Sequence, residues 1–537
     1  MDEVKRGPFA LKEEFQHPFL KSNAKRGANN FMKKTERRNP CNKHVESYLR
    51  NSTLHGLSYV GNRNISYWGR AFWLIAFAIG LSSAGYFIVG IFIKYITNPI
   101  LISMNPSPIG MENVPFPAVT ICNSNLAPKN VPYLSVDKDV TCSQNKISFI
   151  PPDRKSNQLE YIKEFLLNVS QPCKKMLQTC KWNYGANASC EDYFNVIATN
   201  EGICCTFNMI PLKHILRYPE RSELNPSFRA HSEYRPEDWS PSKGYSKDAP
   251  FNVTPFRSPG PGSIAGLTFT LDADIENYSC SDGYSDGVKI LLHNPTQLPN
   301  MQNYGFLLPF GYEIQIVYKP IIYDYLPSFE ALDFNKRMCY FRNERYLRFY
   351  RSYSNNNCRM ECLANKTLKE CGCVPFYCPK ANDTPICLAA NESCVSIVKE
   401  LFEQITENED SCKCKPTCFQ VEYDKVMSYG EITDKFQRKG YLKKKTIDYI
   451  RDNIIVVHVF YEITEFSRFT KQEVYGISDM ISSVGGILGL FLGFSLLSIV
   501  EIVYHLSLKL ICSSIRAKRQ LRSEKNVIVV TPVPFKN

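Results

Sequence analysis

The sequence has no charged residue between positions 71 and 93 or between positions 480 and 500. About 20 apolar residues suffice to cross a bilayer as a helix, which satisfies its own backbone groups where water is absent. The alternative, two buried core helices of a soluble protein, is disfavoured because uncharged stretches of this length are rare outside membranes. We therefore predict transmembrane helices over residues 71–93 and 480–511, with residues 94–479 forming a domain between them.

Net charge is nearly absent from residues 71–511, which hold 44 basic and 45 acidic side chains, although the whole chain carries +12. The basic excess lies in residues 1–70, with 14 basic and 6 acidic side chains, and in residues 512–537, with 6 and 1. Basic flanks stay cytoplasmic, and anionic lipid beside the membrane is a sufficient partner for them. We predict two cytoplasmic tails, a bilayer environment and no binding of nucleic acid.

The central domain has the features of an extracellular compartment. Of the 21 cysteines, 19 lie between the two spans, and such a density is typical of an oxidising environment. Two sequons in the basic tail, at Asn51 and Asn64, are expected to stay unmodified. Seven glycosylation sequons lie in the central domain, at Asn168, Asn187, Asn252, Asn277, Asn365, Asn382 and Asn391.

A cleavable signal peptide is not visible, because residues 1–40 are polar and rich in Lys, Arg and Asn. We expect the first span to serve as an uncleaved signal anchor. The expected location is the plasma membrane, with both termini cytoplasmic and the central domain outside.

Strand patterns dominate the central domain and predict an α+β fold with a β core. Residues 453–464 are apolar on both faces, which predicts a central strand. Residues 161–169 have a helical pattern, and residues 215–262, rich in Pro, Ser and Arg, are predicted to be an exposed insertion. The other predicted strands lie in residues 116–122, 266–274, 287–295 and 312–320.

Histidine is absent from residues 339–418, which hold eleven cysteines. A zinc site would need thiolates in a reducing compartment, and the absence of histidine leaves the common mixed sites without a ligand. We predict disulfides here and no metal.

Five motifs carry a family resemblance, and they occur in the family's order. The chain resembles the epithelial sodium channel/degenerin superfamily, most closely its arthropod pickpocket branch. The resemblance implies a sodium-permeable, amiloride-sensitive channel, a homotrimer or heterotrimer, without a cofactor other than the permeant sodium ion. It also implies a β-rich palm and β-ball with a helical finger, knuckle and thumb, the thumb being residues 339–418. The motifs are FPAVTICN (116–123), GICCTFN (202–208), CRMECLANKTLKECGCVPFY (358–377), CKCKPTC (412–418) and GGILGLFLGFSLLSIVEIVYH (485–505).

The resemblance also implies disulfide pairs. These are Cys122–Cys204, Cys180–Cys190, Cys339–Cys418, Cys358–Cys414, Cys362–Cys412, Cys371–Cys394 and Cys373–Cys387. Because an odd number of extracellular cysteines remains, one thiol should stay free or link to another chain. The unassigned cysteines are Cys142, Cys173, Cys205, Cys280 and Cys378.

The second span has features that favour a pore. Gly485, Gly489 and Gly493 recur every four residues, which lets helices approach closely, although tight packing without a pore would give the same pattern. Glu501 lies at the inner edge of the span, where a carboxylate is costly unless it faces water or a partner. Three copies would form a negative ring that draws cations, whereas the alternative is an interfacial side chain that reaches the membrane surface.

The resemblance assigns the selectivity filter to Gly493, Phe494 and Ser495, which would break the helix and offer carbonyl oxygens to the ion. The bulky side chain of Phe494 should then point away from the ion path. Tyr504 stands where acid-sensing relatives have an Asp, so a second acidic ring is not expected.

The resemblance also points to residues that influence gating. His55 and Gly56 match a His-Gly pair that precedes the first span and re-enters the lower pore in relatives. Ser482 matches a position where bulky substitutions hold family channels open, although a serine there could serve packing alone.

Other classes of protein fit less well. A nucleotide-gated trimeric channel would need a basic cluster for phosphate, and a non-conducting or modulatory receptor subunit would not need Glu501. An ectoenzyme is not expected, because no nucleophile or phosphate-loop motif is present. The extracellular histidines are scattered, and structural roles are expected for them: His214, His231, His293 and His458.

Overall fold

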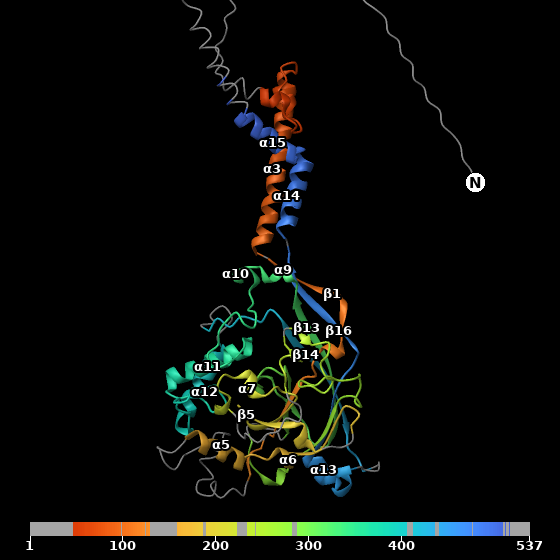
Figure 1. Ribbon diagram of the computed structural model, residues 1–537, viewed down its shortest axis with the longest axis vertical. Helices are drawn as coiled ribbons and strands as arrows, with labels where there is room; N and C mark the ends of the chain where they lie inside the picture. The colour runs from red at the N-terminus through yellow and green to blue at the C-terminus, as the bar shows by residue number, and fades with distance from the viewer. Residues whose placement is uncertain are drawn as a thin grey trace, which may run out of the picture. The chain divides into compact units, whose positions relative to one another are not determined.

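The chain divides into two compact units, residues Met1–Ile91 with Asp479–Asn537, and residues Phe92–Ser478 (Figure 1). The structure is a computed structural model. It describes residues 47–97, 99–123, 125–128, 158–185, 189–222, 234–241, 243–281, 287–404, 412–434, 440–474, 476–508, 511 and 515.

The first span is the helix α3, Tyr67–Thr97, which extends beyond the predicted residues 71–93 at both ends. Only 6% of its most apolar stretch is buried, and large side chains such as Phe72, Ile79 and Phe87 are exposed. A core helix of a soluble protein would be mostly buried, so this exposed apolar surface fits a helix that lies in lipid.

The second span is broken. The helices α14, Ile477–Leu492, and α15, Leu496–Val503, meet at an angle of 75°, and together they are long and apolar enough to cross a membrane. A π-helical turn, Tyr504–Leu508, follows them. The predicted span of 480–511 is therefore bent, with its break at the tripeptide that the resemblance assigns to the filter.

One large sheet organises the other unit, and β13 is its longest strand. β13 pairs in parallel with β15 along its first half and with β16 along its second half, while β14 runs antiparallel to it. The strand order is β1-β16-β13-β15-β9-β4, with β14 also on β13. The bounds are β1 Ile100–Gly110, β4 Leu177–Trp182, β9 Leu267–Asp272, β13 Tyr312–Tyr325, β14 Gln420–Glu431, β15 Ile454–Tyr461 and β16 Glu465–Glu473.

A second sheet has the order β12-β11-β2-β6-β5 and shares its core with the first. The buried ring of Phe116 joins them, with its centroid 4.6 to 5.9 Å from those of Trp182, Phe207, Tyr318 and Tyr461. The bounds are β2 Ala118–Asn123, β5 Phe194–Thr199, β6 Gly202–Phe207, β11 Val288–His293 and β12 Phe306–Leu308. Two small ribbons pair β3 Asn125–Pro128 with β10 Tyr278–Ser281, and β7 Trp239–Ser240 with β8 Gly244–Tyr245.

Helices cover the sheets, and the longest pair, α11 and α12, lie side by side (Figure 1). α11 begins after Ser354, whose side chain accepts a hydrogen bond from the Asn357 amide, and it ends at Gly372 with φ +71°. These are a serine N-cap and a glycine C-cap. The helices are α5 Gln158–Val169, α6 Cys173–Met176, α7 Leu212–Ile215, α8 Met301–Tyr304, α9 Pro327–Glu330, α10 Phe334–Arg337, α11 Asn355–Cys371, α12 Glu392–Gln404 and α13 Ile447–Asn453.

The five predicted strands are confirmed, and β15 lies between β13 and β9, as predicted for a strand that is apolar on both faces. The prediction that 215–262 is an exposed insertion holds for part of its described residues, such as Lys247, Asp248 and Asn252, but is wrong around Trp239. Trp239 is only 3% exposed and packs with Tyr234 and Tyr245. The burial of a large aromatic side chain such as an indole ring contributes strongly to folding stability.

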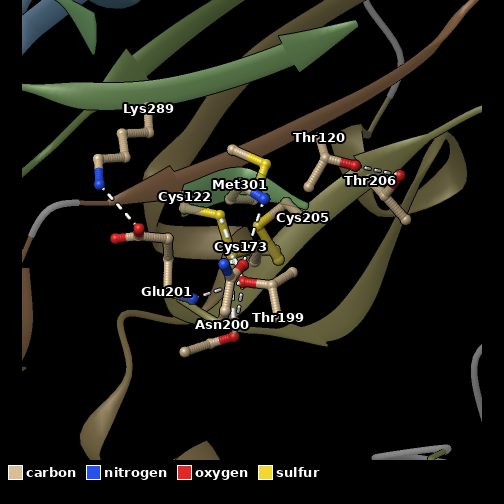
Figure 2. Close-up of a disulfide and its surroundings, with 12 residues drawn as sticks. Thr120, Cys122, Cys173, Thr199, Asn200, Glu201, Cys205, Thr206, Lys289 and Met301 are labelled. Atoms are coloured by element: carbon tan, nitrogen blue, oxygen red, sulfur yellow. Dashed lines mark hydrogen bonds and ion pairs between the residues drawn. A yellow bond between two sulfur atoms is a disulfide. The ribbon is translucent and has the colours of Figure 1, made fainter. Parts of the chain in front are cut away.

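Eight disulfides join the described cysteines, and seven are the pairs that the resemblance implies. The eighth links Cys173 to Cys205 (Figure 2). Cys204 and Cys205 are neighbours in β6, and successive side chains of a strand point to opposite faces. They therefore form disulfides with different partners. Cys205 lies in the hydrophobic core that the two sheets share, whereas Cys204 lies in a second core that also contains Trp239.

Cys378 is the free thiol among the described cysteines, and it is fully buried. Burial raises the pKa of this thiol to about 12, so it stays protonated and poorly reactive. Of the two predicted fates for the odd cysteine, a free thiol fits Cys378 better than a link to another chain. Cys142 lies outside the described residues.

Candidate functional site

The break in the second span is built by Gly493 and Ser495. Gly493 has φ +64°, a backbone conformation that glycine adopts without steric cost. Ser495 caps α15: its hydroxyl accepts from the Ser498 amide at 3.3 Å, and the Ser498 hydroxyl accepts from the Ser495 amide at 3.2 Å. These two residues end one helix and start the next within three positions.

The segment before the first span lies against this break. The His55 amide donates to the Leu492 carbonyl oxygen at 3.0 Å. A Cβ on Gly493 would come within 2.2 Å of the His55 ring, so only glycine fits there without a shift. Gly56 has φ +86° and starts α2, Leu57–Gly61, which packs on α3 through stacked rings of Tyr59 and Trp73 at 4.6 Å. His55 of the predicted His-Gly pair is thus in contact with the predicted filter.

Glu501 receives two hydrogen bonds from Thr53. The Thr53 amide and hydroxyl donate to its Oε2 atom at 3.2 and 2.7 Å. The Thr53 hydroxyl also lies 3.1 Å from that of Ser498, whose side chain is buried. Thr53 was not singled out in the sequence, because a threonine in a polar tail carries no signal of its own.

The other predicted site residues of the span lie apart from this cluster or at its edge. Phe494 is half-buried at the break, and its amide donates to the Leu488 carbonyl oxygen at 3.3 Å. Ser482 is exposed on α14, and a Cβ on Gly485 would meet no atom within 4 Å. Tyr504 packs edge-on against His505 with ring centroids 5.5 Å apart.

The described sequons differ in how open they are. Asn168, Asn252, Asn365 and Asn382 are exposed. Asn277 is half-buried, and its side-chain amide donates to Asp274 at 2.7 Å. Asn391 is half-buried with its oxygen accepting from the Leu388 amide, and Asn187 lies outside the described residues.

Two histidines of the central domain, His293 and His458, have surroundings that fit a structural role. His293 is buried beside Thr120 at 2.8 Å, and burial lowers its pKa to about 4, so it is neutral at physiological pH. His458 lies between Thr268 and Glu313, at 2.9 Å from each. No cluster of possible metal ligands occurs in the part of the chain that the structure describes.

Comparison with known proteins gives one family and several relatives. The family model described as "Amiloride-sensitive sodium channel" matches residues 48–505. Pickpocket protein 28 of Drosophila melanogaster is 34% identical over 90% of this chain and 81% of its own. Acid-sensing ion channel 4 of Homo sapiens is 26% identical over 86% and 79%, and the bile acid-sensitive ion channel of Homo sapiens is 25% identical over 85% and 84%.

Proposed function

Because this chain belongs to the amiloride-sensitive sodium channel family, we propose that it is a subunit of a sodium-permeable, amiloride-sensitive cation channel. The family is one of ion channels rather than enzymes, and its channels assemble as trimers. In the proposal, three subunits, identical or related, surround one axis in the plasma membrane. Both tails are cytoplasmic, and residues 94–479 are extracellular.

The bent second span, with a carboxylate just after the bend, is the observation that supports this proposal most. Glycine and serine at the break free the chain from helical geometry, so that three copies can offer carbonyl oxygens to a partly dehydrated ion. Gly493, Phe494 and Ser495 are the proposed filter. Glu501 would supply a ring of negative charge below it, where a carboxylate is tolerated because it faces water.

The proposed gating residues lie on both sides of the filter. His55 touches the break and Gly56 follows it, so a movement of the N-terminal segment would reach Gly493 directly through His55. Ser482 lies near the outer end of α14, where close packing of three helices would require a small side chain.

Whole-cell recording tests the proposal. Cells that express the chain should carry an inward current that disappears when external sodium is replaced by N-methyl-D-glucamine and falls when amiloride is added. Glu501→Gln should lower unitary conductance or shift cation selectivity, whereas Glu462→Gln, at an exposed extracellular carboxylate, should change neither.

Unchanged unitary current and permeability ratios in Glu501→Gln would remove Glu501 from the ion path. A chain that reaches the surface without current, yet alters the current of a co-expressed related subunit, would favour the alternative of a non-conducting modulatory subunit.

A further inference from the structure

We propose that the end of α5 and the hairpin of β5 and β6 form a binding site for a small uncharged molecule with an apolar ring and one hydroxyl group. The site is a cavity of about 190 Å³, which also contacts the segment that leads from α5 through α6 to β4. This inference goes beyond the proposed channel function, and its test does not require a current.

The hairpin supplies an apolar wall of the cavity. Phe194 and Val196 lie two positions apart in β5, and Ile203 lies two positions before Cys205 in β6. Val196 is paired with Cys205. Residues that are two apart in a strand, or directly opposite each other in an antiparallel pair, share a face of the sheet. These side chains therefore point to one side of the hairpin, and the three apolar ones line the cavity.

Two disulfides hold the walls of the cavity in place. Cys173 lines the cavity and is joined to Cys205, so the segment after α5 is fixed to the hairpin (Figure 2). Cys190 also lines the cavity and is joined to Cys180 of β4. A cavity persists when its surroundings cannot relax inward, and covalent links in its wall oppose such a collapse. The cavity is therefore preformed, and a ligand would not have to open it.

The longer polar side chains at the cavity already have partners. Gln171 donates to the carbonyl oxygen of Asp272 at 2.9 Å and accepts from the side-chain amide of Asn123 at 2.6 Å. Lys174 and Glu191 are exposed and form an ion pair with each other at 3.4 Å, which places them at the mouth of the cavity. A charged ligand would lose its water without gaining a partner inside, at a high cost in free energy. The ligand should therefore be uncharged and mostly apolar.

The volume of the cavity and one hydroxyl define the ligand further. Among the described residues, none forms a hydrogen bond with the half-buried Ser170 hydroxyl, which can therefore bond the oxygen of a ligand. A dry apolar cavity of about 150 Å³ can hold benzene. A cavity of about 190 Å³ has room for the same ring with one or two small substituents. Benzyl alcohol, with one ring and one hydroxyl, represents this class.

Binding to the purified full-length chain in detergent tests the proposal. The probe is 4-fluorobenzyl alcohol, whose fluorine resonance should broaden when the protein is added. An excess of unlabelled benzyl alcohol should restore the narrow line, and the titration should saturate with a Kd of about 0.1 to 1 mM, a normal affinity for so few atoms. Broadening that does not saturate, or that benzyl alcohol does not reverse, is partition into detergent and overturns the proposal.

Filling the cavity should abolish the reversible binding. Val196→Phe places a ring in the space that the ligand would occupy. Val426→Phe makes the same change on β14, at a side chain that is 69% exposed and outside the cavity, and should bind like the wild type. If Val196→Phe does not fold, Leu167→Phe fills the cavity from α5 instead. Reversible binding that survives in a folded filling variant overturns the proposal.

The role of the hydroxyl has its own matched pair of variants. Ser170→Ala should weaken the binding of 4-fluorobenzyl alcohol by about fivefold, the effect of one modest hydrogen bond. The substitution also removes the glycosylation sequon at Asn168, so Asn168→Gln, which removes the same sequon and keeps the hydroxyl, is the control. The probe 4-fluorotoluene, which has no hydroxyl, should bind both variants equally. Equal affinities of the two variants for 4-fluorobenzyl alcohol would overturn the assignment of the site to an alcohol.

Discussion

Different kinds of bond hold the thumb segment, residues 339–418, and the second span. Five disulfides close the thumb, and its helices α11 and α12 pack around buried cysteines. The second span is bent at one glycine and held by a few hydrogen bonds to the N-terminal segment. A covalent frame moves as one body, whereas a span held by hydrogen bonds can change its bend at low cost. We therefore expect substitutions in the thumb to reduce folding and surface delivery, and substitutions in the second span to change the current of channels that reach the surface.

The largest effect should follow removal of a thumb disulfide. Replacing Cys339 and Cys418 by Ser opens a link between residues separated by 79 positions, which should cost about 4 kcal/mol of folding stability. A loss of this size is comparable with the whole stability of many domains, so surface delivery should collapse. Surface biotinylation measures the amount of protein delivered to the cell surface. Cys378→Ala breaks no disulfide and should be delivered far better; equal loss in both would mean that the cross-link itself matters little.

A bulky residue at Ser482 should have the second largest effect, because it should shift the equilibrium between closed and open states. Ser482→Phe should penalise a closed state in which three helices pack closely and leave the open state nearly unchanged. A differential cost of about 2.8 kcal/mol would raise the open-to-closed ratio about a hundredfold. The measurement is the amiloride-sensitive resting current at matched surface expression. A resting current equal to that of the wild type would place Ser482 away from the gate.

Gly493→Ala should have a smaller but still measurable effect. The substitution places a Cβ against the His55 ring and forces alanine into φ +64°, at a cost of about 1–3 kcal/mol. The bend should shift, so that current or selectivity changes while surface delivery is retained. Gly90→Ala is the matched control, because its Cβ would meet no atom within 4 Å. Identical currents in both variants would contradict the role of Gly493 in the bend.

The smallest effect should be the loss of one glycan. Asn365→Gln, at an exposed sequon in α11, should increase electrophoretic mobility by the mass of a single glycan, without loss of current. Asn51→Gln should leave mobility unchanged, since its sequon lies in a tail that we place in the cytoplasm. A shift for Asn51 and none for Asn365 would reverse the proposed topology.

The pattern of the sequence predicted the strands well where one face is buried. β13 and β15 follow their apolar residues closely, because burial of alternate side chains fixes the register of a strand. The segment around Trp239 in the insertion 215–262 was mispredicted, because Pro and Ser outnumber the few aromatic residues that become buried. The pairing of Cys173 with Cys205 could not be predicted either, since distance along the chain does not reveal which face of β6 each cysteine occupies.

Some residues of the candidate site could likewise be predicted from the sequence, and others could not. The motif around Gly493 stands out through the family resemblance, and the carboxylate at position 501 stands out because ionisable residues are rare in an apolar span. Thr53 does not stand out, since threonines are common in polar tails. Its importance arises only when the chain returns to the second span and brings an amide and a hydroxyl to one carboxylate oxygen.

Two apolar spans, a cysteine-rich domain between them and a family resemblance carried by motifs of local spacing can all be read from the order of the residues alone. These follow from residue type and short-range order, because bilayer thickness and strand periodicity act on consecutive residues. The tertiary structure decided which face each of Cys204 and Cys205 occupies, where Trp239 is buried and which residue holds Glu501. These depend on contacts between distant segments, and such contacts are set by the packing of the whole unit rather than by any local pattern.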